Sequence, residues 1–146
     1  MANNNRGFTL IEVLLSVMII SLLVGLSMPV YQSFQSRNDL DVNTQSVAEM
    51  LRRAQSYARS GNSDTTWGVH LTTGKLTLFA GGSYASRTTA KDKTIDMPTS
   101  LIISGLTDVI FSKLNGTPST TGSISLTGTA NDTRTVTIND RGMVNY

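Results

Sequence analysis

One carboxylate stands inside the most apolar part of the chain. Glu12 is the only charged residue between Gly7 and Val30. An ionised side chain at the centre of a bilayer costs about 3 kcal/mol, and such residues usually mark function. Glu12 lies one helical turn from Phe8, near the end of the apolar run, which partly relieves that cost in lipid. If the helix packs among copies of itself, the carboxylate needs a cation, and a cleaved amino terminus on a neighbour would supply one.

The residues around Glu12 resemble a known processing signal. Residues 6–12 read Arg-Gly-Phe-Thr-Leu-Ile-Glu, directly before the long apolar run. This segment resembles the class III signal of type IV prepilins and type II secretion pseudopilins. The resemblance implies that a prepilin peptidase cuts between Gly7 and Phe8, which removes a leader of residues 1–7, and then N-methylates Phe8. It also implies that Glu12 pairs with the amine of Phe8 on an adjacent subunit during filament assembly.

Two other interpretations of the apolar run stay open. At 1.5 Å per residue, residues 8–30 span about 35 Å, which is enough for a plain anchor in a bilayer core of about 30 Å. A conventional secretory signal would be cut near the small residues Gly25 and Ser27, but its apolar stretch is usually shorter and free of acidic residues. We expect residues 8–30 to form a transmembrane and assembly helix.

The resemblance also implies partners and a location. The partners are the prepilin peptidase and N-methyltransferase, other pilin or pseudopilin subunits, an inner-membrane assembly platform, and the membrane itself. The precursor would be a single-pass protein of the cytoplasmic membrane with its head outside the cytoplasm. The processed subunit would then join a cell-surface or periplasmic filament, that is, a type IV pilus or a type II secretion pseudopilus.

Beyond the apolar run the chain becomes amphipathic. Pro29 lacks an N–H and its ring crowds the preceding turn, which predicts a kink in the helix. Gly61 is suited to a left-handed cap at the end of the helix. The apolar residues between these points recur at helical spacings of seven, four, three and four, at Leu40, Val47, Leu51, Ala54 and Ala58. We therefore expect one helix from Phe8 to Ser60, of which residues 31–61 are the amphipathic domain.

From residue 62 onward the pattern favours strands. Apolar residues alternate around Trp67, and residues 66–79 predict a hairpin with a tight turn at Thr72-Thr73-Gly74. Glycine and asparagine turns separate the later strand candidates, which are residues 94–97, 101–104, 108–114, 123–127, 134–139 and 143–146. We predict an α+β, pilin-like fold, in which one long N-terminal helix packs on an antiparallel β-sheet head (62–146) of six or seven strands. Trp67 should anchor the core between sheet and helix.

The head carries a second resemblance. Trp67-Gly68-Val69-His70, and the closing residues Arg141-Gly142-Met143-Val144, resemble the heads of the H-type minor pseudopilins. Those heads have two small β-sheets packed on the helix, so the resemblance implies the same arrangement here.

The lack of cysteine and the single histidine exclude some ways of stabilising the head and argue against catalysis. The chain of 146 residues has no cysteine, which excludes disulfides and thiolate metal sites. Many type IV pilins close a C-terminal loop with a disulfide, and this chain departs from that pattern. His70 is the single histidine, and in an alternating strand it fits a surface or packed position better than a catalytic base. We predict no enzymatic activity, no cofactor and no metal site.

The main functional alternative is a minor pilin that binds DNA for natural competence. Its contacts would be Lys113, Arg134 and Arg141, placed on one face and giving a salt-sensitive affinity. However, the formal net charge is only +2, and the acidic residues Asp132 and Asp140 are interleaved with these cations. We favour a solvated surface for this region over a DNA-binding one.

Overall fold

The computed structural model of the protein describes residues 7–146, apart from the side chains of residues 26–30, 32 and 33. Residues 1–6 of the expected leader lie outside the described residues. The chain divides into two compact units, Met1–Gln35 and Ser36–Tyr146. One helix, α1 (Leu10–Arg59), contributes to both units, and its bounds confirm the predicted helix to within two residues at each end.

The first unit contains the apolar part of α1. From Val13 to Val24, every large hydrophobic side chain is more than half exposed. The backbone is helical through residue 29, where we expected a kink; the side chain of Pro29 lies outside the described residues, so the kink stays a prediction. In the described part of the chain, no helix combines the length and apolar character that crossing a membrane requires.

In the second unit, α1 buries the apolar face that its periodicity predicts. The five stripe residues are at most 1% exposed, namely Leu40, Val47, Leu51, Ala54 and Ala58. The helix ends at Arg59, and Gly61 adopts a left-handed conformation with φ of 65°. Glycine reaches this region at little cost because it has no Cβ. The predicted cap is therefore confirmed, and the chain turns back toward the first strand.

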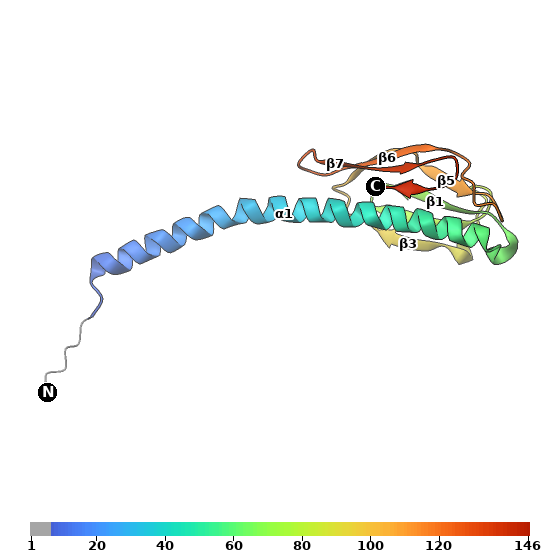
Figure 1. The fold of residues 1–146 in the computed structure, drawn as a ribbon. Helices are drawn as coiled ribbons and strands as arrows, with labels where there is room; N and C mark the ends of the chain where they lie inside the picture. The colour runs from blue at the N-terminus through green and yellow to red at the C-terminus, as the bar shows by residue number, and fades with distance from the viewer. Residues whose placement is uncertain (1–6) are drawn as a thin grey trace, which may run out of the picture. The chain divides into compact units, whose positions relative to one another are not determined.

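The head contains eight strands in two antiparallel sheets, which corrects the predicted number of six or seven (Figure 1). Sheet A has the order β3-β2-β1-β5, with β1 Trp67–Thr72, β2 Lys75–Ala80, β3 Lys93–Asp96 and β5 Asp108–Phe111. Sheet B has the order β4-β6-β7-β8, with β4 Ile102–Gly105, β6 Gly122–Thr127, β7 Thr133–Ile138 and β8 Val144–Asn145. Two short 3₁₀ helices, Asn62–Asp64 and Thr89–Lys91, lie in the connections. The α+β fold of a long helix packed on antiparallel sheets is confirmed.

The core lies between the second part of α1 and the two sheets, with β6 and β7 drawn above the helix and β3 below it (Figure 1). Trp67 is 3% exposed, and its ring meets the edge of Tyr57 from α1 at a centroid distance of 4.9 Å. Its Nε1–H donates to the carbonyl oxygen of Asn62 at 2.8 Å. Because the indole N–H is satisfied, a large aromatic can be buried here without a polar penalty.

Polar side chains of α1 contact the β6–β7 hairpin around its turn. Three contacts join the two elements: Ser36 Oγ to Thr129 Oγ1 at 2.8 Å, Arg37 Nε to Asp132 Oδ2 at 3.0 Å, and Arg134 Nε to Asp41 Oδ1 at 2.8 Å. Two of them come from adjacent residues of the helix and the third from the next turn, so they join the hairpin to one short stretch of α1.

Candidate functional site

Thr9 and Glu12 begin α1 with reciprocal hydrogen bonds. The backbone N–H of Glu12 donates to the Thr9 carbonyl at 3.1 Å and to Thr9 Oγ1 at 3.4 Å, while the Thr9 N–H donates to Glu12 Oε2 at 3.5 Å. This is a capping box, in which two unpaired donors at a helix start are satisfied by each other's side chains. Glu12 therefore has a role in its own chain, and its negative charge also suits the positive end of the helix dipole.

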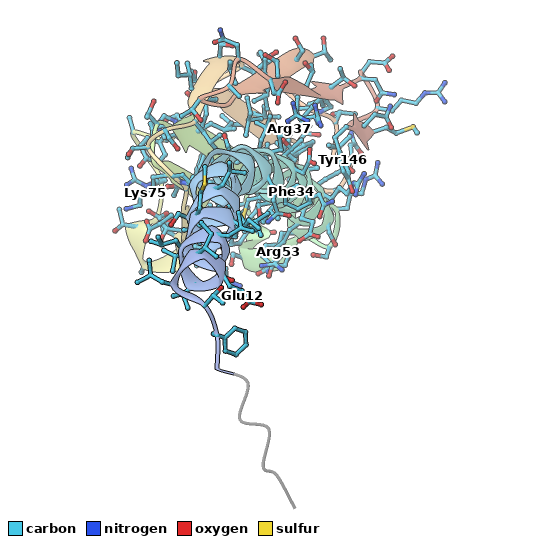
Figure 2. The ribbon with its side chains drawn as sticks, turned by 90° about the vertical axis from the view of Figure 1, so that its left-hand side faces the viewer. Glu12, Phe34, Arg37, Arg53, Lys75 and Tyr146 are labelled. Atoms are coloured by element: carbon cyan, nitrogen blue, oxygen red, sulfur yellow. The ribbon has the colours of Figure 1, made fainter. Side chains whose placement is uncertain are left out.

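Among residues 7–146, the carboxylate of Glu12 has no cation partner. In the described part of the chain no ion pair includes it, and its single side-chain hydrogen bond is the long one to Thr9. Figure 2 shows Glu12 on the outside of the helix at its N-terminal end. The exposed carboxylate can thus accept a positive group from outside the chain, as the interpretation of residues 6–12 requires.

The residues on either side of the expected cleavage point are open. Phe8 is 82% exposed. A Cβ built on Gly7 would meet no heavy atom within 4 Å. The fold therefore does not require glycine at this position, and any requirement for it has to come from a partner that binds the segment.

The three cations considered for DNA lie on three segments of the head, namely the loop after β5, β7 and the turn before β8. Lys113, in the loop after β5, pairs with Asp64, and Arg134 on β7 pairs with Asp41. The hydrogen bond from Lys113 holds the pKa of the Asp64 carboxyl below its usual range. Arg141 has no acidic partner among the described residues. Two of the three charges are therefore neutralised within the head.

A cavity of about 270 Å³ lies beside one of these ion pairs. Its lining comes from α1, β7 and the C-terminal residue: Asp41, Thr44, Gln45, Arg134, Thr135 and Tyr146. The charged side chains of this lining, Asp41 and Arg134, pair with each other.

The histidine belongs to a cluster that sequence reasoning missed. His70 Nδ1 lies 2.7 Å from Asp108 Oδ1, and its ring stacks on Tyr84 at 3.7 Å. Arg87 covers the same tyrosine at 3.8 Å, and its hydrogen bond to Asp92 raises the pKa of the guanidinium above its ordinary value. No nucleophile bonds to His70 in the described part of the chain. The cluster holds the loop after β2 against sheet A.

The N-terminal segment matches a known family. Residues 2–28 match the family described as "Prokaryotic N-terminal methylation motif". The chain is 29% identical over 92 residues to the type IV major fimbrial protein FimA of Dichelobacter nodosus, an alignment that covers 63% of this chain and 59% of that protein. It is 28% identical over 104 residues to a fimbrial protein of Pseudomonas aeruginosa, covering 66% and 68%. The chain thus spans less than two thirds of the FimA protein. These relatives are fimbrial proteins and not enzymes.

The head and helix resemble a solved structure. The minor pseudopilin EpsH from the Type 2 Secretion System of Vibrio cholerae superposes with a TM-score of 0.54 over 73% of this chain and 94% of that one. At 14% identity this likeness shows the fold alone. In its methylation motif, its fimbrial relatives and its fold, the chain is thus similar to the type IV pilins and pseudopilins.

Proposed function

We propose that the protein is a structural subunit of a type IV pilus or a type II secretion pseudopilus. The observation that carries this proposal is an exposed apolar arm whose single carboxylate, Glu12, has no cation partner among the described residues. The named relatives are fimbrial proteins, which supports a structural role over a catalytic one.

The exposed apolar part of α1 has to be buried, either in lipid or against other subunits. Burying a large apolar side chain contributes about 1.5–3 kcal/mol, so an arm with more than ten of them does not stay in water. We infer that the first part of α1 is held in the cytoplasmic membrane before assembly, with the head outside the cytoplasm. An assembly platform then transfers the subunit into a filament, where the arms of neighbouring subunits replace the lipid.

Processing creates the partner for Glu12. The prepilin peptidase cuts after Gly7 and N-methylates Phe8, which leaves a positive amine at the new terminus. That amine pairs with Glu12 of a neighbouring subunit. A subunit in the wrong register would leave a buried anion unpaired, at a cost of about 3–5 kcal/mol. Glu12 therefore sets the register of the filament.

The capping box dictates how this role is tested. Glu12→Ala removes both the charge and the cap, whereas Glu12→Gln removes the charge and keeps a side chain that can make the same capping hydrogen bond. We expect both variants to be cleaved normally and to be lost from sheared filaments. If Glu12→Gln enters filaments as well as the unchanged protein while Glu12→Ala does not, the residue acts through the cap and the charge-pairing role is wrong.

A DNA-receptor role of the head has less support. Lys113 and Arg134 are engaged with acidic residues of the same chain, which leaves Arg141 as the free cation of the three in the described structure. A gel shift with the full chain in detergent tests this alternative. Binding that weakens steeply with salt and is lost in Arg141→Ala would favour it.

A further inference from the structure

The N-terminal end of α1 lies directly beside the expected cleavage point. Thr9 is the N-cap residue, because its carbonyl accepts the first hydrogen bonds of the helix, among them one from the Val13 N–H at 3.2 Å. Residues 7–9 lie outside the helix, which begins at Leu10. The Thr9 hydroxyl completes the cap by accepting from the Glu12 N–H at 3.4 Å. The Gly7–Phe8 peptide bond therefore comes just before the first turn.

The cap uses a hydrogen-bond donor that would otherwise extend the helix. In an α-helix each N–H bonds to the carbonyl four residues earlier, so a longer helix would join the Glu12 N–H to the Phe8 carbonyl. Here that N–H bonds to Thr9, through the carbonyl at 3.1 Å and through the hydroxyl. In the described part of the chain, the carbonyls of Gly7 and Phe8 accept no backbone hydrogen bond. The Thr9 hydroxyl thus opposes extension of the helix across the cleavage point.

We propose that Thr9 is a positioning residue for the cleavage, because it keeps the Gly7–Phe8 bond out of the helix and available to the peptidase. This inference rests on the proposed function, since it concerns the same cleavage. Hydrolysis adds one water molecule, breaks the C–N bond between the two residues, and leaves a carboxylate on Gly7 and an amine on Phe8. Proteolysis favours exposed irregular segments, and a peptide bound in an extended form cannot be helical at the same residues.

The surroundings of the bond leave its conformation to these local hydrogen bonds. Phe8 is 82% exposed, and a Cβ on Gly7 would meet no heavy atom within 4 Å. Packing against the described part of the chain therefore does not hold residues 7 and 8 in place. The segment that matches the methylation-motif family, residues 2–28, includes both the cleavage point and the cap.

The two halves of the capping box contribute differently. The Thr9 hydroxyl bonds to the donor that would extend the helix, whereas the Glu12 carboxylate accepts a longer bond, at 3.5 Å, from the Thr9 N–H. Loss of the hydroxyl should therefore affect cleavage, and loss of the charge on Glu12 should not. The effects of Thr9 on cleavage and of Glu12 on assembly can thus be measured separately.

The kinetics of leader removal test this role. The full-length precursor in detergent is mixed with the prepilin peptidase of its native host, and the products are followed by intact mass. Thr9→Val keeps the branched shape and loses the hydroxyl, whereas Thr9→Asn changes the shape and keeps a good N-cap. A substrate whose binding-competent form is less populated binds more weakly in proportion. Thr9→Val should therefore raise KM about 3- to 10-fold at unchanged kcat, and Thr9→Asn should resemble the unchanged chain.

Two controls identify the cause. Ser16→Ala removes a hydroxyl that bonds to the Glu12 carbonyl at 2.7 Å inside the helix, and it should leave KM unchanged. The Cα chemical shift of Phe8, measured by NMR on the labelled precursor in micelles, reports where the helix begins. It should move toward helical values in Thr9→Val and stay unchanged in Thr9→Asn.

Three results would overturn the inference. The first is a KM for Thr9→Val equal to that of the unchanged chain. The second is a loss in Thr9→Asn as large as in Thr9→Val, and the third is a loss confined to kcat with no change in the Phe8 shift; both would mean that the peptidase contacts the Thr9 side chain directly. An unchanged precursor that is not cut after Gly7 would contradict the proposed function, and this inference with it.

Discussion

Arg134 on β7 and Asp41 on α1 form an ion pair with an Nε–Oδ1 distance of 2.8 Å, across 93 residues of sequence. Both side chains are about half exposed, at 48% and 50%. Ion pairs this exposed contribute about 0–1 kcal/mol, because water screens the attraction and two long side chains must be ordered. The pair thus positions the hairpin on the helix more than it stabilises the head.

A double-mutant cycle on Arg134→Ala and Asp41→Ala measures that contribution. We expect a coupling energy below about 1 kcal/mol, which decreases further at high salt. Denaturant unfolding of the detergent-solubilised chain can be followed through its single tryptophan. A coupling of 2 kcal/mol or more would show that the pair stabilises the head as a buried network does.

Trp67 should matter far more to the head than any surface charge. Trp67→Ala removes a buried ring and its hydrogen bond to Asn62, and we expect a loss of about 3–5 kcal/mol in unfolding free energy. Trp67→Phe keeps most of the packing and should cost clearly less. Circular dichroism during urea unfolding compares the two variants. Equal losses would mean that the hydrogen bond to Asn62, and not the packing on Tyr57, anchors the head.

The ion pair of Lys113 and Asp64 gives a pH-dependent signature. Lys113 lowers the pKa of the Asp64 carboxyl in the folded chain. Its small stabilising effect is therefore present above the unfolded-state pKa of about 3.9 and is lost as the pH falls through the lower folded-state pKa. Carbon-detected NMR titration of Asp64 should show a pKa below that of a free aspartate, and Lys113→Met should raise it. An unchanged pKa in Lys113→Met would contradict the assigned cause.

Much of the fold follows from local pattern. The five apolar residues predicted to form one face of the helix, from Leu40 to Ala58, are all buried. Gly61 was expected to cap the helix, and it adopts the left-handed conformation of such a cap. The strand candidates also correspond to strands, although β5 ends at Phe111, three residues early. Its end is set by the bridge between Phe111 and Pro118 and by the turn at Gly116, whose φ is positive. Alternation of apolar residues does not predict that the chain turns back on β5 at this point.

Two features of the candidate sites were missed for different reasons. The capping box of Thr9 and Glu12 is encoded locally, as Thr-x-x-Glu directly before an apolar run, so it is predictable from the sequence. The pairing of His70 with Asp108 spans 38 residues. It depends on β1 pairing with β5 and not with the intervening β3 or β4, and strand order is not encoded in any local pattern.

Substitution of two glycines distinguishes the competing views of the N-terminal segment. Gly7→Leu should leave the leader attached, whereas Gly25→Leu should be processed normally. A Cβ at either position would meet no heavy atom within 4 Å, so the fold tolerates both changes equally. Intact mass of each variant gives the answer. The reverse outcome, with Gly25→Leu uncut and Gly7→Leu cut, would identify a conventional secretory signal.

The proposed function requires that the chain be cleaved ahead of Phe8 before it joins a filament. Mass spectrometry of the protein from sheared filaments of its native host measures where the polypeptide begins. We expect a polypeptide that begins at Phe8 and carries one added methyl group on its amine. A terminus at residue 1, or one near Ser27, would leave Glu12 without its partner and would overturn the proposed function.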